Sequence, residues 1–278
     1  MKVFVCGVRG STPAPGPGFV RYGGHTSCLA LAQEGRPPSL VVDAGTGIRR
    51  VTELLDGQPF AGSILLGHLH WDHTQGLPFF AGADRPDACT TVYQPAQGDP
   101  VEVLSRFMGP PHFPVLPTGL QGRWRFEALD AGSHEIEGFT VLALDIPHKG
   151  GRTFGYRVSD GRSSLAYLSD HNPVALAGGP GGLGPHHDTA LRLAEGVDVL
   201  IHDAQHTAEE LPAKAAFGHS AAEYALTLAE AAGSRSVLLF HHDPNRTDDE
   251  MDALVARFAE SPLPVTAARE GDVLDLPR

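Results

Sequence analysis

The sequence has few cysteines and no long hydrophobic segment, and both absences narrow its class. No run of about 18 apolar residues occurs in the 278-residue chain, so we predict no transmembrane helix. The N-terminus MKVFVCGVRG lacks the charged and apolar regions of a secretory signal. Cys6, Cys28 and Cys89 are too few and too scattered for a disulfide framework. We therefore expect a reducing, cytoplasmic location.

Positive charge is also scarce: 21 Lys and Arg residues stand against 33 Asp and Glu, a formal net charge of -12. A protein that binds a long nucleic acid needs clustered Lys and Arg, so we expect no polynucleotide partner. A small anionic substrate remains compatible, because a bound metal ion can dominate the local charge. Histidine is abundant instead, with 15 residues, many of them beside Asp or Gly. This composition is typical of a metal site.

The order of predicted elements indicates one α/β domain over residues 1–278. Strand patterns dominate the first part of the chain, and helices alternate with strands after residue 187. Helical spacing is clear in GIRRVTELLDG, SAAEYALTLAEAAG and TDDEMDALVARFAES. Ser220 and Glu223 fit a capping box, and Gly233 fits a C-terminal cap. Packed sheets with helices outside are the simplest architecture for this order.

The stretch GHLHWDH places three imidazoles and a carboxylate between His68 and His73. It follows the apolar strand SILLG, so we expect it in a loop that this strand anchors. Strand alternation would bring His68 and His70 to one side, and the following turn would redirect Asp72 and His73. The four groups could therefore serve two neighbouring metals. Imidazole with carboxylate suits Zn²⁺, Mn²⁺ or iron.

Further candidate ligands follow other predicted strands directly. His148 comes after FTVLALD, Asp170 after SSLAYLS, and His241 after SVLLF. Sites in layered α/β proteins collect at such strand ends. His241 and His242 are adjacent, so only one of them can readily face a given metal, and we favour His241. Two cations about 3.5–4 Å apart lower the pKa of a shared water and clamp an in-line displacement.

The motif H-x-H-x-D-H, followed in order by His148, Asp170 and His241, resembles the metallo-β-lactamase-fold hydrolases. VVDAGTGI before the motif and GHS and FHHDP after it match as well. The SD, IHDA and GHS elements are similar to the phosphodiesterase branch, which contains tRNase Z, the phosphoribosyl cyclic phosphodiesterases and cyclic-nucleotide phosphodiesterase-like proteins. The resemblance runs nearly end to end. It implies a four-layer αββα sandwich with two divalent metals at one edge.

The resemblance also implies how the ligands are divided between the two metals. It assigns His68, His70 and His148 to the first metal and Asp72, His73 and His241 to the second. Asp170 would bridge the two. Zn²⁺ is the expected ion, with Mn²⁺ or Fe²⁺ as alternatives, and hydroxide between the metals would be the nucleophile. Because Asp72 would hold one of the metals that activate this hydroxide, we count it among the catalytic residues.

A histidine and a carboxylate outside the ligand set have a predicted catalytic function. His219, at a predicted helix start, resembles the general-acid histidine of the phosphodiesterase branch, and Asp203 in LIHDAQ resembles its carboxylate partner. A carboxylate would hold the imidazole protonated for donation to a leaving group. The alternative is an ordinary capping or packing histidine. Asp43 in VVDAGTG resembles the buried Asp of the family that orients the His-rich loop, and Asp243 is a candidate hydrogen-bond partner for a metal-bound imidazole.

The substrate contacts are less defined by the sequence. We single out His25 in YGGHTSC and Arg9 in GVRGS as candidate substrate contacts. The alternatives are that His25 is a hydrogen-bonded loop residue and that Arg9 is an ordinary surface arginine. The Gly- and Pro-rich loops 109–123 and 172–187 are predicted pocket walls. Phe107, Met108, Phe113 and Trp124 could form an apolar shelf for a base, a subunit contact, or packing beneath the loop.

The expected activity is hydrolysis of a small phosphodiester such as a cyclic nucleotide or cyclic phosphate. In tRNA 3′ endonucleases of the branch, an arm that grips tRNA lies between the third ligand histidine and the bridging Asp. Here only 22 positions separate His148 from Asp170, which argues against such an arm. A carboxylic ester or lactone hydrolase is another alternative, because a fold does not choose its reaction. A homodimer is compatible with the sequence.

Overall fold

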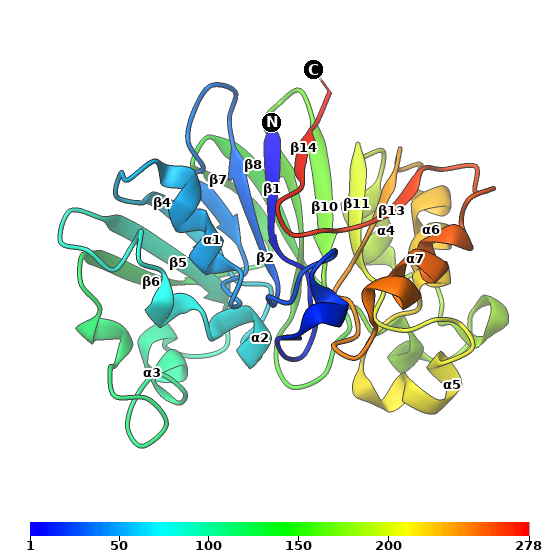
Figure 1. The fold of residues 1–278 in the computed structure, drawn as a ribbon, viewed down its shortest axis with the longest axis horizontal. Helices are drawn as coiled ribbons and strands as arrows, with labels where there is room; N and C mark the ends of the chain where they lie inside the picture. Colours follow the sequence, from blue (N-terminus) through cyan, green and yellow to red (C-terminus); the bar gives the residue numbers. More distant parts are fainter. Residues whose placement is uncertain (278) are drawn as a thin grey trace.

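Two seven-stranded sheets face each other at the centre of the molecule (Figure 1). The structure is a computed structural model that describes residues 1–277, and Arg278 lies outside the described residues. The first sheet has the order β14-β1-β2-β3-β4-β5-β6. Its strands are β1 (Lys2–Gly7), β2 (Cys28–Ala32), β3 (Leu40–Val42), β4 (Ala61–Leu65), β5 (Cys89–Pro95), β6 (Arg123–Leu129) and β14 (Val273–Asp275).

The second sheet has the order β13-β12-β11-β10-β9-β8-β7. Its strands are β7 (Gly132–Ile136), β8 (Phe139–Asp145), β9 (Phe154–Ser159), β10 (Ser164–Leu168), β11 (Val199–Asp203), β12 (Val237–Phe240) and β13 (Val265–Ala267). The strands from β3 to β6 are parallel, and so are those from β10 to β13. Parallel strands end at the same edge of a sheet, so the segments that follow them are brought together there.

The helices are α1 (Ile48–Val51), α2 (Trp71–Thr74), α3 (Pro100–Ser105), α4 (Asp188–Ala194), α5 (Leu211–Lys214), α6 (Ala222–Ala232) and α7 (Asp248–Ala256). Most of them cover the outer faces of the two sheets, whereas α2 and α5 lie beyond the strand ends at the lower edge of Figure 1. In Figure 1, α1 to α3 lie on the side of the first sheet, and α4, α6 and α7 lie on the side of the second. No helix within residues 1–277 is long and apolar enough to cross a membrane.

Strand β2 shows how the sequence produces the layers. Alternate side chains of a strand point to opposite faces of the sheet. Leu29 and Leu31 belong to the core between the two sheets, together with residues such as Val141 and Ile201 of the second sheet. Cys28 and Ala30 belong to the outer core beneath the α1 side.

A third apolar cluster packs α4, α6 and α7 against the outer face of the second sheet. Helix, sheet, sheet and helix therefore form four layers, which confirms the predicted αββα sandwich.

The sequence predicted the end of helix α6 correctly but not its beginning. Gly233 ends α6 in the left-handed conformation (φ 67°), as predicted. The predicted capping box at Ser220 and Glu223 is wrong, because α6 begins after Ala221 and no side chain caps it. The Ser220 hydroxyl donates instead to the carbonyl of His171, and Glu223 accepts from the backbone N–H of Ala208.

Candidate metal centre

The His-rich motif leaves β4 as a loop and then forms one helical turn. His70 keeps extended backbone angles (φ -65°, ψ 156°), and α2 begins at Trp71. Successive side chains of a helix point about 100° apart. Asp72 and His73 are consequently buried, while Trp71 is exposed to solvent. The motif thus delivers side chains from extended and helical backbone to one place.

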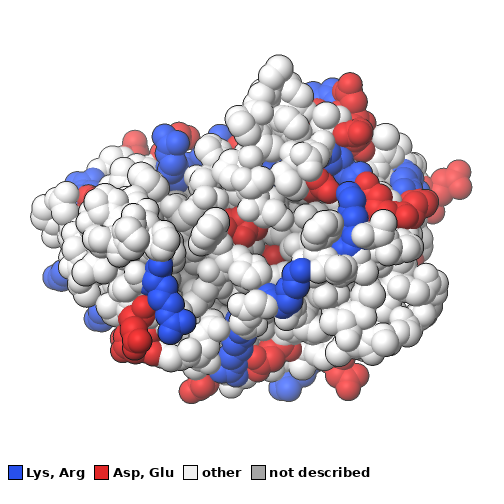
Figure 2. All heavy atoms as spheres, turned by 90° about the horizontal axis from the view of Figure 1, so that it is seen from below, with Lys and Arg blue, Asp and Glu red and all other residues white. Residues whose placement is uncertain are grey.

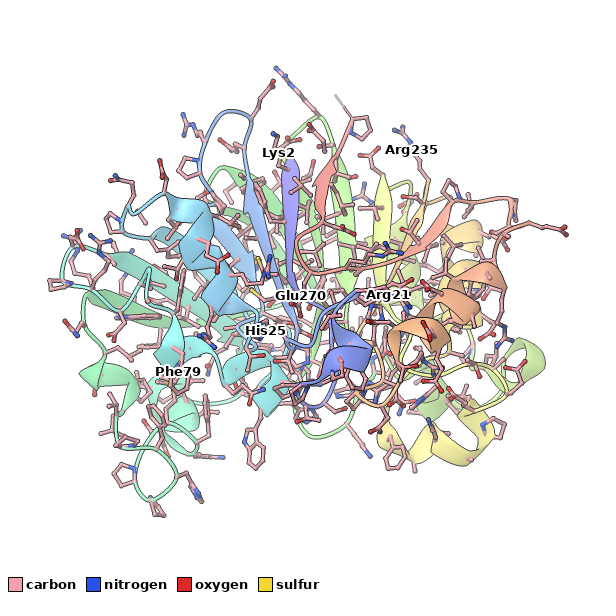
Figure 3. All side chains as sticks on the ribbon, in the orientation of Figure 1. Lys2, Arg21, His25, Phe79, Arg235 and Glu270 are labelled. Atoms are coloured by element: carbon pink, nitrogen blue, oxygen red, sulfur yellow. The ribbon has the colours of Figure 1, made fainter. Side chains whose placement is uncertain are left out.

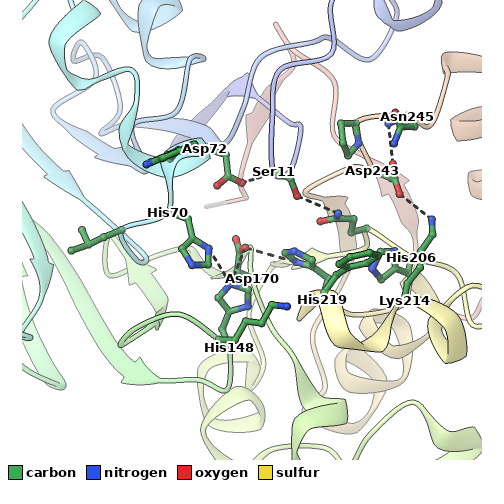
Figure 4. Close-up of a pocket in the computed structure, with 16 residues that line it drawn as sticks. Ser11, His70, Asp72, His148, Asp170, His206, Lys214, His219, Asp243 and Asn245 are labelled. Atoms are coloured by element: carbon green, nitrogen blue, oxygen red, sulfur yellow. Dashed lines mark hydrogen bonds and ion pairs between the residues drawn. The ribbon is translucent and has the colours of Figure 1, made fainter. Parts of the chain in front are cut away.

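The side chains of the predicted ligands form two groups of donor atoms (Figure 4). In each group the donor atoms all lie within 4.8 Å of one another. One group is His68, His70, His148 and Asp170, and the other is Asp72, His73, Asp170 and His241. The structure therefore brings all seven predicted ligands together. It also divides them as the family resemblance implies.

Asp170 belongs to both groups through different oxygens. Its Oδ2 lies 3.0 Å from Nε2 of His73 and 3.3 Å from Nε2 of His241. Its Oδ1 lies 3.6 Å from Nε2 of His148 and 3.8 Å from Nε2 of His68. This orientation is what a carboxylate needs in order to bridge two cations.

Several of these donor atoms are buried without a hydrogen bond. They are both ring nitrogens of His68, Nε2 of His73 and both carboxylate oxygens of Asp170. A buried polar atom without a partner is costly, and native structures contain few of them. Here the unpartnered atoms converge on one volume and are all of types that bind Zn²⁺ and similar divalent cations. The residues therefore fit a pair of metal ions.

The pKa shifts agree with this chemistry. Burial raises the pKa of the Asp170 carboxyl, but the imidazoles of His241 and His73 lower it more, to well below its ordinary value. Burial lowers the pKa of His68 well below its usual range. Burial also lowers the pKa of His241, but Asp170 and Asp72 raise it to about 9. Cations would replace the protons that the carboxylates attract to His241, since metal binding releases protons from its ligands.

Asp43 orients the motif from behind. Its carboxylate is fully buried and accepts from the backbone N–H of Gly67 (2.7 Å), from Nδ1 of His73 (2.6 Å) and from the hydroxyl of Tyr167 (2.7 Å). The bond to Nδ1 leaves Nε2 of His73 facing the cluster. This confirms the function predicted for Asp43.

The other anchored imidazoles follow the same pattern. Nδ1 of His148 donates to the carbonyl of Gly218 (2.8 Å), and Nδ1 of His241 donates to Oε1 of Gln205 (3.0 Å). Gln205 thus has the place that the sequence suggested for Asp243. That suggestion is wrong, because Asp243 pairs with the side chain of Lys214 at 3.1 Å.

His241 rather than His242 faces the cluster. A left-handed backbone at His241 (φ 56°) turns its side chain inward. His242 points away and donates from Nε2 to the carbonyl of Ala268 at 2.9 Å.

The predicted catalytic pair lies beside the metal ligands. Nδ1 of His219 is 2.9 Å from Oδ2 of Asp203 and 3.8 Å from Oδ1 of Asp170. Asp203 is fully buried, and backbone N–H groups of Gln205 (3.0 Å) and His171 (3.2 Å) hold its carboxylate. The structure therefore brings together the two residues for which the sequence predicted a proton-transfer function.

Two predicted substrate contacts lie elsewhere. The guanidinium of Arg9 is fully buried and donates to the carbonyls of Gly23 (2.7 Å) and Arg246 (2.7 Å), so it joins two loops instead of facing a substrate. His25 is half-buried, with Nδ1 3.2 Å from the Thr46 hydroxyl, and its backbone N–H donates to Glu270. His25 and Glu270 lie near the middle of the view in Figure 3. Neither Arg9 nor His25 lines the cavity over the metal ligands.

That cavity has a volume of about 640 Å³. Neither of the loops 109–123 and 172–187 lines it, so their predicted place as walls of this cavity is wrong; His112 and Phe113 of the first loop line an adjoining cavity instead. The walls are short segments that follow the strands, and they contribute Ser11, Lys149, His206, Lys214, Phe217 and Asn245.

His206 is the functional candidate that the sequence analysis missed. It is 1% exposed, lines the cavity, and has no hydrogen bond at either ring nitrogen within residues 1–277. The available signal was its position just after β11, the same placement that identified the other ligands.

The face that carries the site is not strongly basic. In Figure 2, acidic atoms lie in the depth of a central hollow, and Lys and Arg side chains are scattered around it between acidic ones. A phosphate group in the hollow would thus meet local cations and not a continuous basic surface.

Comparison with known proteins identifies the family. Residues 39–242 match the model of the β-lactamase superfamily domain. The chain is 31% identical to a ribonuclease BN of Escherichia coli, with 73% of this chain and 77% of the relative covered. It is 26% identical to a ribonuclease Z of Natronomonas pharaonis over 91% and 92% of the two chains. Among solved structures, a diphosphatase of the PhnP family has a TM-score of 0.69 at 17% identity, with 99% and 97% covered. The chain therefore belongs to the β-lactamase superfamily, in the phosphodiesterase branch of its metal-dependent hydrolases.

Proposed function

We propose that this hydrolase cleaves a small phosphodiester, such as a cyclic nucleotide or another cyclic phosphate. The observation that carries the proposal is the position of the His219–Asp203 pair, 3.8 Å from the shared carboxylate of Asp170. Displacement at phosphorus requires a nucleophile and a proton for the leaving oxygen. Residues of both candidate metal-binding groups and the candidate proton donor His219 line the same cavity.

The two donor groups would hold two divalent cations, and their imidazole and carboxylate atoms favour Zn²⁺. When bound, these cations supply an activated water and positive charge for the phosphoryl oxygens. The protein's own contribution is rigidity. Asp170 presents one oxygen to each group, and Asp43 and Gln205 hold Nδ1 of His73 and His241.

His219 is the proposed general acid. Asp203 accepts the Nδ1–H bond at 2.9 Å, so Nε2 is the nitrogen left to exchange a proton with the leaving oxygen. The two backbone N–H bonds to Asp203 keep that carboxylate from rotating. General-acid catalysis of this kind matters most when the leaving group is a poor one, such as an alkoxide.

The dimensions and lining of the cavity support a small substrate. Its volume of about 640 Å³ lies within the usual range for small-molecule sites. His206 and Asn245 offer donors to phosphoryl oxygens. Lys214 adds a positive charge at the wall, although Asp243 at 3.1 Å and Glu210 at 3.6 Å share it.

RNA 3′ processing is the second candidate, favoured by the ribonuclease Z and ribonuclease BN names of the relatives. In this chain the residues between His148 and Asp170 include strands β9 and β10, which pair with each other inside the sheet. A long RNA would also meet the mixed charge seen in Figure 2. Both features support the smaller substrate.

The test is a substrate panel with purified protein loaded with Zn²⁺ or Mn²⁺. The panel holds 2′,3′- and 3′,5′-cyclic nucleotides, an aryl phosphodiester, a lactone and a precursor tRNA. We expect metal-dependent hydrolysis of cyclic nucleotides, abolished by Asp72→Ala. His219→Ala should lower kcat for the cyclic nucleotides by about 10²- to 10⁴-fold but affect the aryl ester much less, because its leaving group needs no proton.

His134→Ala is the matched control. His134 is a half-buried histidine of β7, remote from the metal ligands in the sheet order, whose Nε2 bonds the carbonyl of Asp130 at 2.9 Å. Its removal should leave every rate unchanged. Turnover of the lactone with inert phosphodiesters would refute the proposal and leave His219 without a catalytic function. Site-specific cleavage of precursor tRNA with inert cyclic nucleotides would favour the second candidate.

A further inference from the structure

A second cavity of about 480 Å³ adjoins the one over the metal ligands. Its lining is mostly aromatic and apolar and includes Trp71, Phe79, Phe107, Met108 and Phe113. Trp71 lines both cavities. A molecule bound over the metal ligands would therefore have a wall in common with the second cavity.

Helix α2 explains why Trp71 stands between the two cavities. Its neighbours Asp72 and His73 are buried in the metal-binding group, whereas Trp71 is 72% exposed. Phe79 is 57% exposed and meets Phe113 edge to face, with ring centroids 5.8 Å apart. Figure 3 shows Phe79 on the side of the molecule that carries α2 and α3. Large apolar side chains left in water around a hollow mark a binding surface.

The aromatic lining is accompanied by a cation and by polar groups. The side chain of Arg106 lines this cavity, and within residues 1–277 it makes no ion pair and no hydrogen bond. Thr46, Gln75 and His112 add polar atoms. A guanidinium beside aromatic faces suits a planar ring that carries hydrogen-bond acceptors, because arginine both stacks on such rings and donates to their edges. A purely aliphatic ligand would make no use of Arg106.

We propose that the second cavity is a nucleobase subsite, in which the base stacks on Trp71 and its edge faces Arg106. The substrate would then be a nucleoside phosphodiester whose phosphate lies over the metal ligands. This link to catalysis rests on the proposed function, whereas base binding does not. Stacking on an aromatic side chain strengthens nucleotide binding on the order of 10- to 100-fold per base.

The sequence offers a direct reporter, since the chain has two tryptophans, Trp71 and Trp124. Trp124 does not line either cavity. Its Nε1 donates to the carbonyl of Gln121 at 2.6 Å, and its ring stacks on Phe126. Trp124→Phe leaves Trp71 as the single fluorophore, and Trp71→Phe leaves Trp124. The two variants form a matched pair for the same measurement.

The experiment titrates adenosine into each metal-loaded variant and follows tryptophan fluorescence, with ribose as the probe that lacks a base. We expect saturable quenching by adenosine in Trp124→Phe, none by ribose, and none by either probe in Trp71→Phe. Adding Phe113→Ala to Trp124→Phe should weaken adenosine binding, because it removes part of the aromatic lining and the contact that holds Phe79. Equal quenching in both single-tryptophan variants, or no quenching in either, overturns the proposal.

Two further readouts separate the subsite from its alternatives. If a second copy of this chain covers the cavity, sedimentation should show a dimer, and the Trp71 emission of Trp124→Phe should shift over the same range of protein concentration. This result would also overturn the proposal. The ratio of kcat/KM for a 2′,3′-cyclic nucleotide to that for ribose 2,3-cyclic phosphate should be about 10- to 100-fold in the wild type and fall in Trp71→Ala. A ratio near one that Trp71→Ala does not change overturns the subsite but leaves the phosphodiesterase standing. Adenosine quenching without hydrolysis of any phosphodiester would overturn the proposed phosphodiesterase activity but leave the base subsite standing.

Discussion

Asp43→Asn should weaken metal binding at one of the two donor groups while leaving the fold in place. Both oxygens of Asp43 accept hydrogen bonds: Oδ1 from the N–H of Gly67, and Oδ2 from His73 and Tyr167. Only an ionised carboxyl can accept all three, because an amide has a single oxygen. The N–H of Gly67 cannot become an acceptor, so the oxygen of the introduced amide must stay at that position. The amide nitrogen would then face His73.

The consequence falls on the tautomer of His73. Because Nδ1 of His73 would face the N–H of the introduced amide, it must accept a hydrogen bond, and the ring proton moves to Nε2. Nε2 lies 3.0 Å from Asp170 and 3.2 Å from Asp72, so it is the atom needed as a ligand. Loss of such an orienting partner typically lowers metal affinity by 10- to 100-fold. Replacing the buried charged bond should also lower the free energy of unfolding by about 1–3 kcal/mol.

Chelator competition and metal analysis would measure this effect. We expect one metal equivalent held at wild-type affinity and the second weakened, since none of the side chains of His68, His70 and His148 bonds to Asp43. Tyr167→Phe is the control, because it removes one donor to Asp43 but keeps the carboxylate and its bond to His73. Its metal affinities should stay close to wild type. Two equivalents bound at wild-type affinity in Asp43→Asn would refute the tautomer argument.

Two more predictions follow from the packing around the adjacent residues His241 and His242. In Gly10→Ala the new Cβ would collide with the imidazole of His241 and lie 2.9 Å from Oε1 of Gln205. Metal analysis of this variant should therefore show a fall from two bound equivalents towards one. Gly18→Ala is the control and should bind both metals, because its Cβ would meet only Thr247 at 3.7 Å. Burial lowers the pKa of His242 to about 3 from 6.5, so the unfolded chain gains a proton first and stability is lost as pH falls below 6.5, by up to about 1.4 kcal/mol per pH unit. Urea unfolding at saturating Zn²⁺ between pH 6.5 and 4.5 should therefore show a shallower decline in His242→Gln than in the wild type, and parallel profiles would contradict the assignment.

The ligand set could be predicted from the sequence because the chemistry restricts the residue types and the fold restricts their positions. His68, Asp170 and His241 each follow a strand, and β4, β10 and β12 end at the edge where parallel strands of the two sheets meet. Strand β14 was not predicted, since it is short and depends on pairing with β1 at the other end of the chain. Pairing between residues so far apart leaves no local pattern.

Arg9 and Asp243 show where residue type is insufficient. Both were chosen for their residue type and the motif around them, but the direction of each side chain depends on loop packing. The carbonyls of Gly23 and Arg246 enclose the guanidinium of Arg9. Asp243 turns to Lys214, and a neutral glutamine, Gln205, bonds to His241 instead. No local sequence rule would have chosen a glutamine over an adjacent carboxylate.

Asp43 and Asp170 make the same point within a single residue type. Each directly follows a predicted apolar strand, each is fully or almost fully buried, and each lies within 3.0 Å of a ring nitrogen of His73. Asp43 has its oxygens satisfied by three donors, whereas neither oxygen of Asp170 has a hydrogen bond within residues 1–277. A buried carboxylate that is satisfied can only orient its neighbours. One that is left unsatisfied among imidazoles is available to cations. The sequence placed both aspartates near the motif, but only their hydrogen-bond partners separate the orienting residue from the candidate bridge between two metals.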